Sequence, residues 1–190
     1  MKSPIYIALV HYPIQNKQGD IVTTSITNFD LHDLGRTSKT FGVEKYFVVT
    51  PQKSQQGMAL FIKQYWNEGT GSVYNPSRKE ALELLEVASS LEEVKLTIQN
   101  QHNKKPLLFG TTAKKSKDSL TYEGVRKKLE TEDTPILLAF GTGWGMPASL
   151  MATFDGVLEP ILGPGDYNHL PVRSAVAIIL DRLCGNRGNI

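Results

Sequence analysis

Short apolar runs rich in β-branched and aromatic residues alternate along this chain with longer segments that have helical periodicity. This alternation is typical of domains in which helices connect successive strands of a parallel sheet. The sequence therefore predicts an α/β fold with a mainly parallel sheet and helices on both of its faces. The expected strands are 5–10, 45–50, 71–75, 106–110, 135–141 and 156–161.

The helical segments are marked by apolar periodicity and by capping residues. Ser77 with Glu80, and Ser90 with Glu93, have the spacing of a capping box, which begins a helix. Residues 94, 96 and 98 also alternate as in a strand, so a strand remains the alternative to a helix at 90–101. The expected helices are 28–42, 56–66, 77–90, 90–101, 121–130 and 171–183.

A chain of 190 residues is long enough for one α/β domain, and we expect a single domain over 1–190. No apolar run approaches the roughly 20 residues that cross a membrane, and the first residues lack the cleavage site of a signal peptide. The single cysteine, Cys184, excludes an intramolecular disulfide and fits the cytoplasm, where we expect the protein to act. The four histidines lack metal-ligand spacing, so we expect no metal site.

Three glycines at alternate positions follow the apolar run at 135–140, in the stretch ILLAFGTGWGMP. Glycines placed in this way let a ligand or another chain segment approach the backbone closely. A dinucleotide-binding fingerprint has a different spacing and normally follows the first strand, whereas this turn follows about the fifth. A Rossmann-type oxidoreductase therefore remains an alternative, with Glu159 as its ribose-binding acid. A tight glycine turn without a ligand is the other alternative.

Three strand-to-loop junctions in the C-terminal half resemble one another. They are 107–115, 137–147 and 158–171, and each carries an apolar run into a loop of Thr, Gly or Pro residues. Loops at the carboxyl ends of parallel strands gather at one edge of the sheet and form its ligand crevice. Backbone groups from three such loops suit a neutral planar ligand such as adenine.

These loops, together with the segment DLHDLGRTSKTFGV at 30–43, resemble the SPOUT superfamily of S-adenosylmethionine-dependent RNA methyltransferases. Arg36 falls on the arginine of the family's first motif, Asn-x-Gly-x-x-x-Arg. Asp30 and Pro171 stand where the branch that methylates ribose 2′-hydroxyls has asparagines. The resemblance points to a small bacterial group related to tRNA (guanine-N1)-methyltransferases, and the two departures leave the methylated atom open.

The resemblance implies a C-terminal deep trefoil knot over about 104–185, a homodimer, S-adenosylmethionine as cofactor and tRNA or rRNA as substrate. It implies that Arg36 is catalytic, although an ion pair with Asp30 or Asp33 is an alternative role for this side chain. A knotted protein that binds S-adenosylmethionine or RNA without methylation is the alternative function. The implied cofactor-binding residues are Gly110, Thr111, Thr112, Ala113, Phe140, Gly141, Thr142, Gly143, Gly145, Ile161, Leu162, Gly163, Gly165, Tyr167, His169, Leu170 and Val172.

The net charge is only +2, so affinity for RNA requires local basic clusters. Lys114, Lys115 and Lys117 follow the strand expected at 106–110, and Arg173 lies in the first turn of the last helix. Cations beside a ligand loop suit a surface that follows RNA phosphates, although many charge runs are only solvated faces. We expect RNA contacts at these four residues. The aromatic pair 65–66 either stacks on a base or packs in the core.

Overall fold

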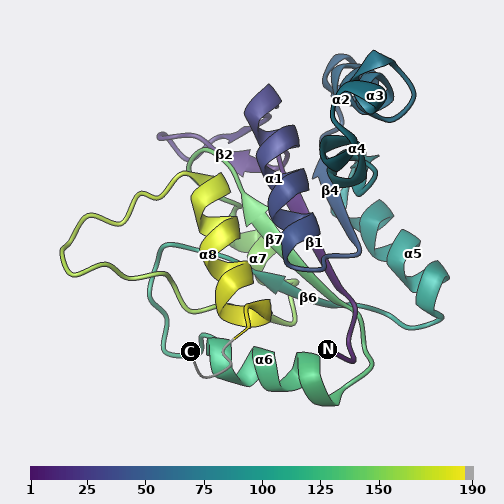
Figure 1. Cartoon of the computed structure of the whole chain (residues 1–190). Helices are drawn as coiled ribbons and strands as arrows, with labels where there is room; N and C mark the ends of the chain where they lie inside the picture. The colour runs from purple at the N-terminus through teal and green to yellow at the C-terminus, as the bar shows by residue number, and fades with distance from the viewer. Residues whose placement is uncertain (187–190) are drawn as a thin grey trace.

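A six-stranded parallel sheet lies at the centre of the computed structural model, which describes residues 1–186 (Figure 1). Its strand order is β5-β4-β1-β7-β6-β8, and each neighbouring pair is parallel. A small antiparallel hairpin, β2–β3, follows the central strand. The strands are β1 (Ile5–Val10), β2 (Ile14–Gln15), β3 (Ile21–Val22), β4 (Lys45–Val49), β5 (Leu85–Ala88), β6 (Leu107–Gly110), β7 (Ile136–Gly141) and β8 (Gly156–Val157).

Helices cover both faces of the sheet, as expected. The α1, α4, α6 and α8 helices pack on one face, and α5 and α7 pack on the other. The α2 and α3 helices project at one end of the molecule (Figure 1). The helices are α1 (Asn28–Thr40), α2 (Lys53–Asn67), α3 (Thr70–Tyr74), α4 (Pro76–Leu82), α5 (Leu91–His102), α6 (Tyr122–Thr131), α7 (Ala148–Met151) and α8 (Val172–Cys184).

The central strand β1 explains why this sheet has two hydrophobic layers. Successive side chains point to opposite faces, so Ile5 and Ile7 enter one core while Tyr6 and Ala8 enter the other. All six residues of β1 are buried, as in a strand that has helices on both sides. The apolar runs of the sequence are continuous for this reason.

Two expectations for the region before β5 are wrong. Residues 71–75 lie in α3 and its C-cap rather than in a strand, and Val73 and Tyr74 are each 85% exposed, with no sheet partner to cover them. The helix expected at 77–90 ends at Leu82, and Leu85–Ala88 pairs with β4 as the edge strand β5. The side chain of Asn75 caps this helix by accepting from the Arg78 N–H, and Pro76 occupies its first turn, so Ser77 is not the cap.

The segment 90–101 forms α5, so the strand alternative there is wrong. Ser90 caps the helix by accepting from the Glu93 N–H at 3.2 Å. The Glu93 carboxylate accepts from the N–H of Ser89 rather than that of Ser90, which shifts the second half of the capping box by one residue. Within residues 1–186 no helix has the length and apolar character needed to span a membrane.

A buried histidine joins β1 to two other segments at the carboxyl edge of the sheet. The Nδ1 atom of His11 lies 2.9 Å from Thr24 Oγ1, which also contacts the hydroxyl of Thr142. Thr142 donates its hydroxyl proton to the Val10 carbonyl at 3.0 Å. Thr24 must then donate to Thr142 and accept from His11, so His11 is the neutral tautomer with its proton on Nδ1. Its Nε2 atom is buried without a partner in the described residues.

Burial of this ring makes the stability of the fold depend on pH. Desolvation lowers the pKa of His11 to about 4, and the nearby Asp30 carboxylate opposes the shift only in part. The unfolded chain binds this proton below about pH 6.5, whereas the native state does not until about pH 4. The contribution of the neutral His11 ring to the unfolding free energy is therefore fully present above pH 6.5. We expect the unfolding free energy to fall by an amount on the order of 3 kcal/mol as the pH is lowered to 4.

Urea unfolding of the wild type and of His11→Asn between pH 4 and 7.5 measures this effect. The variant should show a flatter pH profile, with a remaining slope from His32, whose pKa burial also lowers. His169→Asn removes an exposed histidine and serves as the control. Equal slopes of the unfolding free energy against pH for wild type and His11→Asn would contradict the lowered pKa of His11.

Candidate functional site

The three loops expected to hold a ligand leave the sheet at the same edge. The β6, β7 and β8 strands are parallel neighbours, so the loops that follow them start side by side (Figure 1). We name them the first loop (111–121), the second loop (142–147) and the third loop (158–171). The Asn168 side chain donates to the Ala113 carbonyl at 2.8 Å, which joins the third loop to the first.

The second loop owes its glycines to backbone conformation and to packing. Gly143 and Gly145 have φ angles of +55° and +95°, a region that other residues adopt only with strain. A Cβ atom on Gly143 would lie 3.3 Å from the Ile14 side chain and 3.4 Å from that of Thr24. The segment that approaches Gly143 is therefore the β2–β3 hairpin region, and a valine at this position would clash with the protein itself rather than with a ligand.

Two threonines of the loops tie the backbone to neighbouring strands. The Thr111 hydroxyl donates to the Ala139 carbonyl at 3.0 Å, as the Thr142 hydroxyl does to Val10. These hydrogen bonds fix both side chains at the start of the first and second loops.

Glu159 has a structural role at the start of α6. One of its carboxylate oxygens accepts from the Tyr122 N–H at 2.9 Å, and its carbonyl accepts from the Tyr122 hydroxyl at 3.0 Å. This carboxylate caps a helix, where negative charge is favourable. A role as the ribose-binding acid of a Rossmann fold is therefore unsupported.

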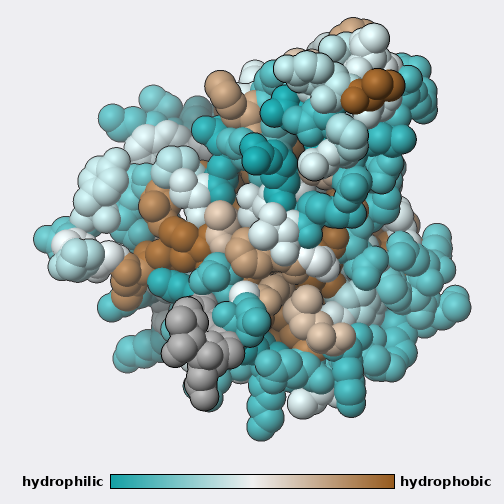
Figure 2. All heavy atoms as spheres, in the orientation of Figure 1, coloured by the Kyte–Doolittle hydropathy of each residue, from teal (hydrophilic) through white to brown (hydrophobic). Residues whose placement is uncertain are grey.

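The third loop supplies open backbone and exposed apolar side chains. Among the described residues, apart from the immediate chain neighbours, no atom lies within 4 Å of the position that a Cβ would take at Gly163 or Gly165, or at Gly145 of the second loop, so a ligand has room against the backbone. Leu162 and Tyr167 are exposed, and Figure 2 shows hydrophobic surface beside α8 and this loop. Backbone donors and acceptors next to apolar surface fit a neutral planar ring.

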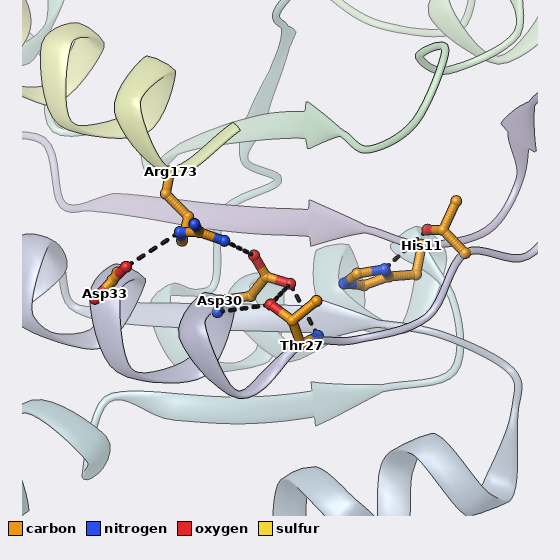
Figure 3. Close-up of polar contacts among 6 residues, drawn as sticks. His11, Thr27, Asp30, Asp33 and Arg173 are labelled. Atoms are coloured by element: carbon orange, nitrogen blue, oxygen red, sulfur yellow. Dashed lines mark hydrogen bonds and ion pairs between the residues drawn. The ribbon is translucent and has the colours of Figure 1, made fainter. Parts of the chain in front are cut away.

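The two carboxylates considered as partners of Arg36 pair with Arg173 instead (Figure 3). The Arg173 guanidinium lies 3.3 Å from Asp30 Oδ1 and 3.1 Å from Asp33 Oδ2. Within residues 1–186 no carboxylate pairs with Arg36, which is exposed on α1. An RNA phosphate would have to compete with both carboxylates for Arg173.

Asp30 is the feature of this site that sequence reasoning missed. Its carboxylate is 5% exposed and accepts from the N–H and the hydroxyl of Thr27, at 3.0 and 2.7 Å. Thr27 in turn caps α1 by accepting from the Asp30 N–H. The spacing of Thr27 and Asp30 is that of a capping box with aspartate as its acid, so the signal was present. The pairing of Asp30 with Arg173, which lies 143 positions away, could not be predicted from the sequence.

The lysines of the first loop remain available for a ligand. Lys114, Lys115 and Lys117 are exposed, and none pairs with a carboxylate in the part of the chain that the structure describes. No group of three or more His, Cys, Asp or Glu side chains is placed to hold a metal ion among residues 1–186. Burial raises the pKa of the Cys184 thiol to about 11, so it stays protonated and unreactive at neutral pH.

Comparison with known proteins gives the family. The family described as SAM-dependent RNA methyltransferase, where SAM is S-adenosylmethionine, matches residues 4–185. An uncharacterized protein of Aquifex aeolicus is 43% identical over 179 residues, which are 94% of this chain and 87% of that protein. A tRNA (guanine-N(1)-)-methyltransferase of Oleidesulfovibrio alaskensis is 40% identical over 96% of this chain, which spans only 42% of that protein.

A solved structure supports the same fold. TrmJ from Z. mobilis ZM4 is similar over 97% of this chain and 69% of its own, with a TM-score of 0.62 and 14% identity. The resemblance to S-adenosylmethionine-dependent RNA methyltransferases that the motifs indicated is confirmed. The chain belongs to the family of S-adenosylmethionine-dependent RNA methyltransferases.

Proposed function

We propose that this protein is a cytoplasmic homodimer that transfers a methyl group from S-adenosylmethionine to a nucleotide of tRNA. The observation that carries the proposal is the meeting of three loops at the carboxyl edge of β6, β7 and β8, with free lysines on the first. Family membership supports the cofactor, and the name of the Oleidesulfovibrio relative supports tRNA over rRNA. The whole chain, 1–190, acts as one domain in this proposal.

The three loops would hold the cofactor through their backbone. We place the adenine ring against the open glycines of the second and third loops, where backbone N–H and C=O groups recognise its edge. Bound S-adenosylmethionine supplies an electrophilic methyl group on a sulfonium. The loop residues orient this methyl and exclude water, while Phe140, Ile161 and Val172 support the loops from the core. The remaining cofactor residues expected from the sequence lie on these three loops, except Gly110 and Gly141, which end β6 and β7.

The knot is part of the same proposal. Leu120 donates its N–H to the Val157 carbonyl, and its own carbonyl accepts from the Glu159 N–H, so the end of the first loop lies beside the start of the third. The Asn168–Ala113 hydrogen bond brings the far part of the third loop back to the first loop. In the proposed knot, residues within 104–185 thread one loop through another, which requires the first and third loops to lie in contact.

Arg36 would act on the cofactor of the other subunit. No residue of the three loops lines the cavity that Arg36 faces, which contains Asn75, Ser77 and Arg78. A homodimer that brings α1 of one subunit to the loops of its partner resolves this separation. The guanidinium would then stabilise a phosphate or the developing oxyanion of the nucleotide, with a fork geometry that lysine lacks.

The cofactor site is tested by a valine at Gly165. The position is open, so Gly165→Val should fold normally and obstruct the ligand, costing on the order of 2 kcal/mol or about 30-fold in S-adenosylmethionine affinity. Isothermal titration calorimetry with S-adenosylmethionine and with NAD measures this. Gly57→Val, at an open position on α2, is the matched control. Unchanged affinity in Gly165→Val would remove the third loop from the site.

The lysines of the first loop are tested by salt dependence. Lys114→Ala combined with Lys115→Ala should flatten the slope of log K for tRNA against log salt by roughly 1 to 2. The reason is that tRNA releases fewer counterions on binding when each lysine is absent. Lys2→Ala with Lys127→Ala removes two other exposed lysines as a control. An unchanged slope with weaker cofactor binding would mean that the first-loop lysines support the loop and that RNA binds elsewhere.

The role of Arg36 and the homodimer are tested together. Arg36→Ala should retain folding and S-adenosylmethionine binding but lower methyl transfer about 100-fold, because one preorganised charge is lost. Mixed with Gly165→Val, it should recover up to about a quarter of wild-type activity, since half of the dimers are mixed and each has one complete site.

Full turnover by Arg36→Ala would remove this residue from catalysis. A mixture without recovered activity would mean that each site is built within one chain. Cofactor and tRNA binding without any methyl transfer by the wild type would favour the alternative function, a binding protein.

A further inference from the structure

Two arginines from different helices line one small cavity at the junction of α1 and α4. The cavity has a volume of about 250 Å³ and is lined by Arg36, Asn75, Ser77 and Arg78. The two helices meet closely there, since a Cβ on Gly35 would lie only 3.0 Å from the Ala81 carbonyl oxygen. This close packing places the guanidinium of α1 next to that of α4.

The cavity is electropositive, and one of its donors is buried and unsatisfied. Within residues 1–186 neither Arg36 nor Arg78 pairs with a carboxylate, and the Nε of Arg78 is buried without a hydrogen-bond partner. The acids nearby are engaged elsewhere, because Asp33 pairs with Arg173 and Glu80 pairs with Lys39.

The positive charges of this cavity affect the pKa of the neighbouring His32. Burial is the main cause that lowers its pKa, and the charges of Arg78 and Arg36 lower it further, against an opposing effect of Asp33.

Arg78 is held in place by an aromatic side chain. Its guanidinium lies over the ring of Trp66, 4.6 Å from the centroid, and this ring makes an edge-to-face contact with His32. Trp66 is partly buried against the core, so packing rather than base stacking is its role. A guanidinium fixed in this way loses little entropy when it binds an anion.

We propose that this cavity binds a phosphodiester group of the substrate RNA, gripped by Arg36 and Arg78 with the Ser77 hydroxyl as a further donor. Two forked cations in a small polar cavity match the oxygens of one phosphate group. An exposed aromatic side chain favours RNA over a free anion, because Tyr74 directly precedes the cavity residue Asn75, is 85% exposed and offers a face to a base. Figure 2 shows hydrophobic surface at this end of the molecule, where α2 and α3 lie. The inference rests on the proposed function and adds Arg78 and Ser77 to its RNA-binding residues.

Ser77→Asp tests the site without disturbing the stacking of Arg78 on Trp66. Ser77 is exposed in the first turn of α4, where an acid is compatible with the helix, so folding and S-adenosylmethionine binding should stay unchanged. We expect about 10-fold weaker tRNA binding at low salt and a salt slope lower by about 1, because one phosphate contact is lost. Ser54→Asp, which adds the same charge at an exposed position in the first turn of α2, is the matched control and should bind as wild type.

Arg78→Lys and Arg78→Ala complete the test, with unfolding measured for each. Lysine keeps the charge but not the forked geometry, so Arg78→Lys should keep the wild-type salt slope of tRNA binding while its tRNA affinity falls. Arg78→Ala should show both a smaller salt slope and a lower tRNA affinity. An unchanged tRNA slope in Ser77→Asp would overturn the proposal. Tripolyphosphate binding that is lost in Ser77→Asp while tRNA binding is retained would identify a free-anion site and also overturn it. If the wild type transfers no methyl group yet Ser77→Asp weakens tRNA binding as expected, the phosphate site stands and the proposed enzyme activity fails.

Discussion

The buried carboxylate of Asp30 holds together the two segments on which the site depends. It caps the start of α1 through Thr27 and pairs with Arg173 at the start of α8, so the first and last motifs of the chain are joined by one side chain (Figure 3). Breaking a fully buried ion pair costs about 3–5 kcal/mol, and less is expected here because the Arg173 side chain is 35% exposed. The arrangement fixes the direction of α1, and with it the place of Arg36, relative to the helix that follows the third loop.

This connection bears on the identity of residue 30, where this chain has aspartate and the branch that methylates ribose 2′-hydroxyls has asparagine. An asparagine at this position would leave the Arg173 guanidinium with only the half-exposed Asp33 as a charge partner, whereas aspartate adds a buried carboxylate. The aspartate also lies beside the neutral ring of His11 and partly opposes the fall in its pKa (Figure 3). The polar groups at the carboxyl edge of the sheet are thus mostly paired with one another, apart from Nε2 of His11. In the proposed function the loops above this edge bind the cofactor mainly through their backbone.

The sequence was informative where one physical rule dominated. Continuous apolar runs located β1, β4, β6 and β7, because strands with helices on both sides need apolar residues at every position. It failed at 77–90, since the apolar residues there satisfy helical periodicity up to Leu82 and then strand pairing with β4. Only the tertiary pairing decides between the two.

The candidate site was predictable as a set of loops but not in its contacts. The alternate glycines correctly indicated a close approach to the backbone, yet the approaching atoms belong to Ile14 and Thr24, in a hairpin region with no pattern that predicts its position. Glu159 was considered as a ribose-binding acid and Arg173 was expected to contact RNA, whereas both are committed to partners 37 and 143 residues away. The cavity shared by Arg36 and Arg78 likewise exists only because α1 and α4 pack closely. Long-range pairings of this kind leave no periodic trace in a single sequence.

Transfer of labelled methyl groups tests the central claim most directly. The purified protein is incubated with S-adenosylmethionine carrying an isotope-labelled methyl group and with tRNA from a strain that lacks the protein, and the nucleosides are then analysed by mass spectrometry. We predict one labelled methylated nucleoside that is missing from the tRNA of the deletion strain and present in that of the parent strain. An unlabelled tRNA pool, with identical nucleosides in the two strains, would contradict the claim.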